Sequence, residues 1–575
     1  MTDAKALYGT DAPIVPSERV IVGKLSFTLE EGALRHIRVG EAEILRGISF
    51  LVRDKDWGTL IPQLDLSDRQ VSEQCALITM RAVYENNAAR LNVQLKIAAE
   101  VNRLVVSAIG VAEGDFETNR AGFTLLHPAG LAGQPVSIGH SDGKTSETEF
   151  PRLIDPWQPF MDITEMAHKD NGLEVTCPLL GDTFETEDQR QWGDASFKTY
   201  NRPLAKPWPY VLEDGSNLGQ SVEVCWRTCH TAPAKWKTSQ VEDEDPVRFP
   251  ETAILVNAID VDRAIATPSD IRDVAPQRLL CSLDETLGDV SRQCRAFAAL
   301  QRHFPEVTLD LEAVCTFEQR PQTALERLRK EIDAAGFLPA SILVCPSVDR
   351  QSTPPGSEWP ACPPLEEIHD ASNAVFADLP RGGGMVTFFP ELNRKRPPVE
   401  KLDFVSHALC PIVHAADDVS VMETLESIPH ITASARAFIG KTQYRIGPCT
   451  VAMRHNPYGK RTIPNPGRDR VCMAHDDPRH SAAFGAAYAI GLACALAPSG
   501  IAVWTPSELY GQRGLIGPLR DVVTMLARFS HQAVKEASVQ NGLGRLRVET
   551  SDLLVNLAPE NRNDLPAFGW RQNTD

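Results

Sequence analysis

Carboxylate side chains that could activate a water molecule follow two short apolar runs in the second half of the chain. MVTFF (385–389) leads into PELNRKRP, which contains Glu391, and IAVW (501–504) leads into TPSELYGQRG, which contains Glu508. A carboxylate acts as general base when ionised and as general acid when its surroundings raise its pKa. We therefore take Glu391 and Glu508 as candidate catalytic residues, with Glu391 as the first choice for the base. The plainer interpretation is that Glu391 caps the following segment or pairs with Arg394.

Imidazole and guanidinium groups accompany two other apolar runs. FVSHA (404–408) contains His407, a third candidate catalytic residue, and CTVAM (449–453) is followed by Arg454 and His455. Arginine and histidine donate hydrogen bonds to an oxyanion or to hydroxyl groups, so we assign Arg454 and His455 to substrate binding. A histidine inside an apolar strand is also common as a hydrogen-bonded core residue. An Arg-His pair before Asn-Pro can simply shape a turn.

Motifs of several other chemistries are missing from the sequence. It contains no HExxH, no His-x-His pair and no GxSxG elbow, and the close pair Cys225 and Cys229 lacks the second pair that a zinc site needs. We expect neither a metal nor another cofactor. What remains is a set of carboxylates, imidazoles, guanidiniums and aromatic rings. Trp504 is one of the rings that we assign to ligand binding. This set suits a polyhydroxylated ligand and predicts a hydrolase acting on a sugar or a sugar derivative.

The pattern after about residue 250 predicts the element that positions these residues. Short apolar runs alternate with helical segments, such as 321–336, which begins at Pro321 and ends at Gly336, and 365–376. Eight such units over about 260 residues fit a (β/α)8 barrel of the TIM type, whose active site lies at the carboxyl ends of its strands. A doubly wound open sheet is the alternative, although no Gly-rich phosphate turn is present. The predicted strands are 253–256, 279–282, 307–312, 342–345, 385–389, 404–408, 449–453 and 501–504, with GGG (382–384) as a turn before the fifth.

The rest of the chain reads as β-structure. Apolar and polar residues alternate in short runs over 20–245, which predicts a large antiparallel β-sandwich. Alternation returns near the end, in RLRVETSDLLVNLAPE, and predicts a short C-terminal β segment. We therefore expect a multidomain α/β plus β protein with domains at 1–245, 246–540 and 541–575.

Composition limits the partners and the compartment. The chain has 58 Lys and Arg against 76 Asp and Glu, a formal net charge of −18, which disfavours nucleic acid and anionic membranes. The N-terminus has no secretory signal, and no apolar run is long enough for a membrane span. Thirteen scattered cysteines without a signal favour reduced thiols in the cytoplasm. Nothing in the sequence specifies an oligomeric state.

The stretch FETEDQRQWGDASFKTYNRPLAKPWPY (184–210) is too rich in charges and rings for a simple connection. One interpretation is that it reaches from the sandwich over the barrel mouth, where its charges contact the ligand and its rings form walls. The other is an ordered seam between domains, with Arg–carboxylate pairs and tryptophan filling gaps. On the first interpretation, the substrate-binding residues of this stretch are Asp188, Arg190, Trp192, Asp194, Lys198 and Tyr200.

This stretch also resembles the signature of the D-apionate lactonase family. Further similar pieces are RGISFLVRDKDWGTL (46–60), GFTLLHP (122–128), PELNRKRP (390–397) and SELYGQRGLIG (507–517), in the same order. Where the family pattern reads Asn-Trp-Thr-Asp, this chain has Gln191-Trp192-Gly193-Asp194, a departure that could alter ligand contacts. The resemblance implies an N-terminal β domain, a TIM-type barrel and a short C-terminal β part. It also implies a cytoplasmic bacterial hydrolase of D-apiose catabolism that opens D-apionolactone to D-apionate, a carboxylic-ester hydrolase.

Lactone opening needs an activated water and a donor for the oxyanion. Glu391 would be the base, and Arg190, Arg454 or His455 the donor. The alternative enzyme is a glycoside hydrolase, whose two barrel-rim carboxyls lie about 5–5.5 Å or 6.5–9.5 Å apart. A sugar-binding protein without catalysis is the third possibility, and it predicts rings in the pocket but no carboxylate poised to activate water.

Overall fold

A computed structural model of the chain describes residues 3–55, 57–87, 89–229, 246–353, 355, 357–459 and 461–574. These residues form two compact units. The first, here called the β-rich unit, comprises 13–190 and 195–229. The second, the barrel unit, comprises 3–12, 191–194 and 246–574. The predicted boundary at 245 adjoins residues 230–245, which lie outside the described residues, so the division into three domains stays a prediction.

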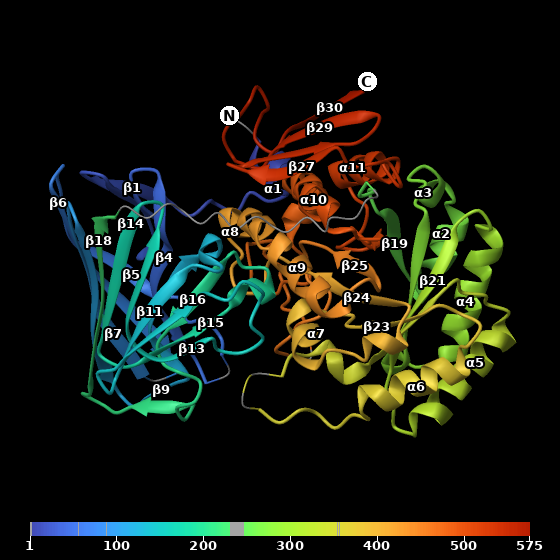
Figure 1. Cartoon of the computed structure of the whole chain (residues 1–575), viewed down its shortest axis with the longest axis horizontal. Helices are drawn as coiled ribbons and strands as arrows, with labels where there is room; N and C mark the ends of the chain where they lie inside the picture. The colour runs from blue at the N-terminus through green and yellow to red at the C-terminus, as the bar shows by residue number, and fades with distance from the viewer. Residues whose placement is uncertain are drawn as a thin grey trace. The chain divides into compact units, whose positions relative to one another are not determined.

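The β-rich unit is built on one antiparallel sheet of 16 strands, in the order β1-β2-β3-β4-β10-β16-β15-β13-β14-β18-β8-β7-β6-β5, with β11 paired to β13 and β12 paired to β11 (Figure 1). A small second sheet pairs β9 with β17. The strands are β1 Ser17–Val22, β2 Leu25–Glu30, β3 Ala33–Val39, β4 Ala42–Arg53, β5 Gln63–Val71, β6 Cys75–Asn86, β7 Ala89–Glu100, β8 Arg103–Glu113, β9 Phe116–Thr118, β10 Arg120–Pro128, β11 Pro135–His140, β12 Thr145–Glu149, β13 Phe160–Asp170, β14 Leu173–Leu180, β15 Phe184–Glu187, β16 Ser196–Tyr200, β17 Tyr210–Leu212 and β18 Asn217–Thr228.

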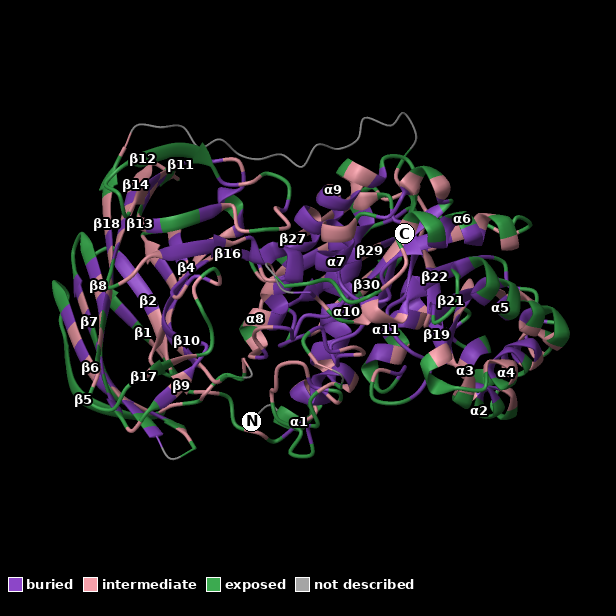
Figure 2. Cartoon of the chain, turned by 90° about the horizontal axis from the view of Figure 1, so that it is seen from below, coloured by how far each residue is buried: buried purple, intermediate pink, exposed green. Residues whose placement is uncertain are grey.

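The alternating sequence of this unit produces one shared core. Along β6 and β7 every second side chain is buried, because successive residues of a strand point to opposite faces. Strands far apart in the sheet order, β1 with β6 and β10 with β18, contact each other, so the sheet folds back on itself around that core. Figure 2 shows the alternation as changes of colour along these strands. The predicted antiparallel sandwich is confirmed.

The barrel unit contains a closed barrel of parallel strands β19–β26, which confirms the predicted (β/α)8 class and removes the open-sheet alternative. Its strands are β19 Glu251–Asn257, β20 Arg278–Asp284, β21 Thr308–Cys315, β22 Ile342–Pro346, β23 Arg381–Gly384, β24 Phe404–Leu409, β25 Gln443–Cys449 and β26 Val503–Trp504. Its α-helices are α1 Ala4–Tyr8, α2 Val261–Ala266, α3 Ser269–Arg272, α4 Val290–His303, α5 Pro321–Ala335, α6 Leu365–Val375, α7 Phe389–Lys395, α8 Asp418–Glu423, α9 Ile428–Ile439, α10 Ala483–Leu496 and α11 Pro518–Ala527.

Two predicted helices are confirmed with their ends. Helix α5 begins at Pro321, where a missing N–H costs nothing, and ends before Gly336, whose φ of 67° suits a residue without a Cβ. Helix α6 covers the second predicted segment. The Ala-rich α10 is buried along nearly its whole length (Figure 2). Among the described residues, no helix is long and apolar enough to cross a membrane.

Two strand predictions were wrong in position. The fifth strand is Arg381–Gly384, so the glycines taken for a turn form the strand, and 385–389 leads out of it. A Cβ on Gly383 would meet Leu402 at 2.7 Å and His369 at 2.8 Å, so the close packing here requires glycine. The seventh strand is β25, which ends at Cys449 and does not begin there. In both cases the most apolar run of residues follows the strand, so the predicted strand lies too late in the sequence.

A four-stranded antiparallel sheet completes the barrel unit, as the sequence predicted for its short C-terminal β part. Its strands are β27 Glu536–Gln540, β28 Leu543–Arg547, β29 Ser551–Asn556 and β30 Trp570–Thr574. It packs on α10, which explains why that helix is apolar on all sides.

Candidate active site

Charged side chains cluster where the barrel strands end. Three ion pairs lie there, each between a carboxylate in or after a barrel strand and an arginine of a loop. They are Asp284–Arg350 at 2.7 Å, Glu312–Arg454 at 2.6 Å and Glu508–Arg513 at 2.7 Å. In the third pair both residues belong to the loop after β26. The pKa of Arg454 is raised although burial opposes this, because the three carboxylates all act on its guanidinium. The structure therefore places Arg454 and Glu508, which the sequence predicted near the ends of barrel strands, in one cluster.

His455 lies beside the three arginines of this cluster. Burial, and then the guanidiniums of Arg454, Arg350 and Arg513, lower its pKa well below the usual value for histidine. Its Nε2 atom is buried, and no described residue forms a hydrogen bond with it. The ring is therefore neutral, and one of its nitrogens is ready for a hydrogen bond to a ligand.

Glu391 lies in the first turn of α7, at the same end of the barrel. Its Oε1 accepts hydrogen bonds from the Ser352 hydroxyl (2.5 Å), the Thr353 backbone N–H (3.2 Å) and Arg394 (3.1 Å). Its Oε2 is buried and finds no donor among the described residues, and burial raises the pKa of the carboxyl. The plainer interpretation, a pair with Arg394, is thus present. Its catalytic role stays a prediction.

The segment Gln191–Asp194 belongs to the barrel unit, and it contributes a carboxylate to the loops of the barrel. Asp194 Oδ2 lies 2.7 Å from Nδ1 of His414, which is in the loop after β24. Nε2 of His414 lies 3.2 Å from the hydroxyl of Tyr458, in the loop after β25. The side chains of His414 and Asp194 are 16% and 18% exposed, so solvent reaches both.

Aromatic rings surround this Asp–His pair. The ring of Trp192 lies 5.6 Å from that of His414 and 5.3 Å from that of Tyr458, between centroids. The guanidinium of Arg394 lies 5.9 Å from the Trp192 ring, which links this group to Glu391. The Ser427 hydroxyl donates to the carbonyl of Gly193 at 2.7 Å and fixes the segment.

The other candidates of the stretch 184–210 belong to the β-rich unit. Arg190 is fully buried, donates to Asp188 at 2.6 and 2.8 Å and donates to the carbonyl of Pro151 at 2.8 Å. Lys198 pairs with Glu187 at 2.7 Å, and the Tyr200 hydroxyl donates to Glu185 at 2.5 Å. Asp188, Arg190, Lys198 and Tyr200 thus belong to the β-rich unit, whereas Trp192 and Asp194 belong to the barrel unit. The part of these four residues in substrate binding stays a prediction.

Two candidates face the layer between strands and helices. His407 is fully buried, with Nε2 2.6 Å from the Tyr444 hydroxyl and Nδ1 2.9 Å from the Ala408 carbonyl, and burial lowers its pKa to about 4. Trp504 is fully buried and donates to Thr252 at 3.0 Å. Alternation along a strand explains both, because the neighbours Ser406 and Thr505 point into the barrel. The structure therefore gives neither side chain access to a ligand.

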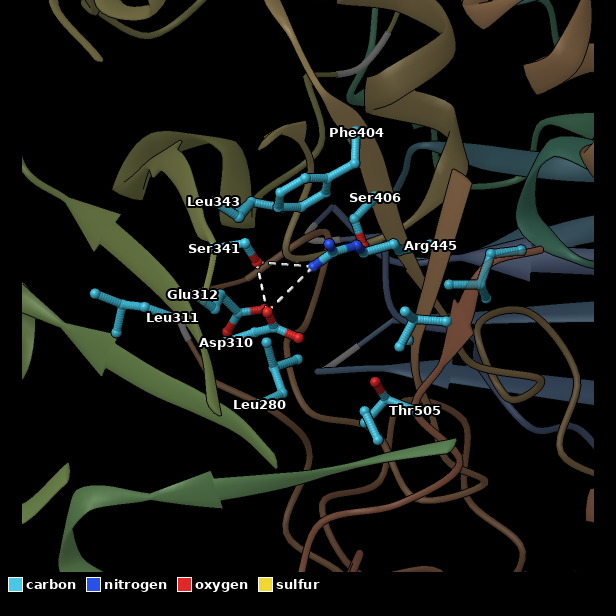
Figure 3. Close-up of a pocket in the computed structure, with 14 residues that line it drawn as sticks. Leu280, Asp310, Leu311, Glu312, Ser341, Leu343, Phe404, Ser406, Arg445 and Thr505 are labelled. Carbon is cyan, nitrogen blue, oxygen red and sulfur yellow. Dashed lines mark hydrogen bonds and ion pairs between the residues drawn. The ribbon is translucent and has the colours of Figure 1, made fainter. Parts of the chain in front are cut away.

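The barrel interior holds a small cavity of ≈ 30 Å³, lined by apolar side chains and by a few charged and polar ones (Figure 3). Near the amino ends of the strands, Ser341 donates to Asp310 at 2.6 Å and accepts from Arg445 at 2.9 Å. Paired groups at this end of a barrel serve stability, whereas chemistry occurs at the other end. Among the described residues, no group of three or more His, Cys, Asp or Glu side chains is arranged to hold a metal ion.

Comparison with known proteins decides the family. Residues 5–229 match the N-terminal domain of D-apionate lactonase, and residues 252–538 match its TIM barrel domain. A D-apionate lactonase from Brucella anthropi is 40% identical over 527 residues, which are 89% of this chain and 86% of that protein. The chain belongs to the D-apionate lactonase family. It is accordingly a lactone-hydrolysing enzyme, a carboxylic-ester hydrolase.

Solved structures resemble this lactonase only remotely. A putative aldose 1-epimerase from Escherichia coli K12 has 8% identity and a TM-score of 0.26, with 37% of this chain and 99% of that one covered. A GH36 α-galactosidase from Geobacillus stearothermophilus has 9% identity and a TM-score of 0.27, with 94% and 91% covered. Neither likeness bears on the chemistry of this chain.

Proposed function

We propose that this enzyme hydrolyses D-apionolactone to D-apionate at the carboxyl end of its barrel, as a step of D-apiose catabolism. The observation that carries the proposal is the Asp194–His414 pair, at 2.7 Å, among loops of that barrel end. A carboxylate bound to Nδ1 fixes the imidazole tautomer and orients Nε2, which lies 3.2 Å from the Tyr458 hydroxyl, as the atom that accepts a proton from water. The relative from Brucella anthropi, named D-apionate lactonase, supports the choice of substrate.

The reaction proceeds in two steps. Nε2 of His414 takes a proton from water while the water oxygen forms a bond to the lactone carbonyl carbon, giving a tetrahedral oxyanion. The oxyanion then collapses, the bond from the acyl carbon to the ring oxygen breaks, and His414 returns its proton to the departing alkoxide. The product acid ionises, so each lactone consumed releases one proton.

The oxyanion needs a donor that is in place before the reaction. His455 supplies it in this proposal, because its neutral ring has a buried Nε2 with no partner among the described residues. The arginines beside it are held by their own carboxylates and contribute positive potential. The rings of Trp192 and Tyr458 provide flat faces for the carbon skeleton of the sugar.

The substrate is tested with a panel. We expect the purified enzyme to consume D-apionolactone with proton release, and to leave aryl glycosides intact. Release of the aryl group without lactone loss would favour a glycoside hydrolase, and neither reaction would favour a binding protein. The cytoplasm is the proposed compartment, supported by thirteen free cysteines, most of them buried.

A further inference from the structure

A second cluster of cationic groups lies within the β-rich unit. Arg120, the first residue of β10, is 7% exposed, and its guanidinium lies 3.9 Å from the centre of the Tyr200 ring and 5.4 Å from that of Trp57. The guanidinium of Arg202 lies 4.3 Å from the centre of the Tyr210 ring. The Nε atoms of both arginines are buried, and no described residue accepts a hydrogen bond from them.

Other deeply buried arginines of this chain are paired. Arg190 and Arg479 are fully buried, and each donates two hydrogen bonds to an aspartate, Asp188 and Asp477 respectively. A buried charge without a counter-ion is costly, and contact with an aromatic face offsets only part of the cost. Arg120 has no carboxylate partner among the described residues. Its surroundings are therefore those of a guanidinium that binds an anionic ligand.

Several features describe the anion. The Trp57 ring lies 5.2 Å from that of Trp208, and Trp208 is 41% exposed, so the cluster has an aromatic wall open to solvent. Burial raises the pKa of Tyr210, and both guanidiniums oppose that rise, which places them near the same ring. The buried Oδ1 of Asn119, beside Arg120, also lacks a donor among the described residues and suits a ligand hydroxyl.

The charge of the cluster favours a monoanion. Among the described residues around the two guanidiniums, Asp182 pairs with Lys206, and Glu185 accepts the hydrogen bond of the Tyr200 hydroxyl. Lys198, 5.3 Å from the Tyr200 ring, is balanced by Glu187. One positive charge is left, which one carboxylate neutralises. Guanidiniums bind carboxylates through paired hydrogen bonds, and aromatic faces pack against the C–H groups of a sugar.

We propose that Arg120 and Arg202 form a carboxylate-binding site for a sugar acid, walled by Trp57 and Trp208. The site is made of residues of the β-rich unit and uses neither member of the Asp194–His414 pair. It does not depend on which lactone the enzyme hydrolyses, because it requires only a monoanionic polyhydroxy acid.

Tryptophan fluorescence tests the site directly, since two tryptophans form its wall. We expect D-gluconate to change the emission of the full-length protein saturably, and D-glucitol, which has hydroxyls but no carboxylate, to leave it unchanged. Arg202→Gln and Arg120→Gln should each weaken gluconate binding by about tenfold or more. Arg227→Gln, at a 77% exposed arginine of the same unit, is the matched control and should leave the affinity unchanged.

Three outcomes would overturn the proposal. The first is no saturable signal with gluconate, and the second is tighter binding of inorganic phosphate that Arg202→Gln abolishes. The third is gluconate binding that is lost in His414→Asn but kept in Arg202→Gln, which would place the acid at the barrel end. If the lactonase proposal fails but this site exists, gluconate should still bind to the wild type and to His414→Asn. A melting curve is recorded for each variant to check that it folds. If Arg120→Gln does not fold, the affinity of Arg202→Gln, a change at a half-buried residue, decides the test.

Discussion

At the scale of single residues, the Asp194–His414 pair makes the sharpest prediction. His414→Asn removes the base, and kcat should fall by about 10²–10⁴-fold with little change in Tm. Asp194→Asn should also lower kcat, because the tautomer is no longer fixed. The control is His531→Asn, since His531 lies 3.2 Å from Glu251 in a similar His–carboxylate pair and should leave kcat unchanged. Equal activity of His414→Asn and wild type in steady-state assays would remove His414 from the mechanism.

Glu391→Gln separates a catalytic from a structural role for that residue. Its carboxylate is held by Arg394, Ser352 and Thr353, so we expect the change to cost about 1–3 kcal/mol of unfolding free energy and to affect kcat less than His414→Asn does. Thermal melts and kinetics on the same preparation measure both. A kcat lowered by about 10²-fold or more with an unchanged Tm would instead make Glu391 the base.

Several residues of the candidate site could be predicted from the sequence, and others could not, while their roles stay predictions. Glu508, Arg454 and His455 follow strands, so the strand-end rule led to them. His407 and Trp504 sit inside strands, where one position decides whether a side chain faces the barrel or the helices. His414 was missed because it lies five residues beyond its strand, in PIVHAADD, and its partner Asp194 is 220 positions away. No local pattern links such a pair.

At the scale of elements, two strands of the β-rich unit, β10 and β13, predict acid sensitivity through a pair of buried histidines whose ring centroids lie 6.1 Å apart. His127 of β10 and His168 of β13 are buried, and burial lowers their pKa values to about 3 and about 4. The unfolded chain, whose histidines have pKa values near 6.5, then binds more protons than the folded one, so stability falls as pH drops from about 6.5 toward 4. Between these two pH values, the lowered pKa of His168 accounts for a loss of about 3 kcal/mol of unfolding free energy.

Thermal melts at several pH values test this sensitivity. Tm should fall between about pH 7 and pH 5, and His168→Phe should make the fall shallower, because that ring cannot be protonated. A slope unchanged by the substitution would mean that other groups cause the acid loss.

The glycine strand β23 gives a packing prediction. Gly383→Ala places a Cβ against Leu402 and His369, and overpacking of this kind costs about 1–3 kcal/mol. Gly219→Ala in β18 is the control, since a Cβ there meets nothing within 4 Å. Tm should fall for the first variant and stay nearly constant for the second. An unchanged Tm for Gly383→Ala would show that the strand has room to adjust.

The same strand shows where sequence reasoning succeeds and fails for elements. The repeated alternation of apolar strand and amphipathic helix identified the barrel, and caps such as Pro321 and Gly336 fixed helix ends closely. Strand β23 was missed because RGGG has none of the β-branched or aromatic residues that indicate strands, and its glycines are dictated by neighbours distant in sequence.

At the scale of the whole molecule, membership of the family and the geometry of the barrel loops point to one chemical step. The family is that of a lactonase, and the loops of the barrel supply a partly exposed Asp–His pair, aromatic walls and a neutral imidazole. We propose that in this step a water molecule, activated by His414, attacks the acyl carbon of D-apionolactone, and that no side chain of the enzyme forms a bond to that carbon.

A single-turnover reaction in ¹⁸O-labelled water tests this claim most directly. With enzyme in excess over D-apionolactone, mass spectrometry should find one labelled oxygen in the carboxylate of D-apionate and none in the protein. His414→Asn should produce the same labelled product far more slowly. Unlabelled D-apionate from the first turnover, together with label on Glu391 or another carboxylate of the enzyme, would contradict the account and indicate a covalent intermediate.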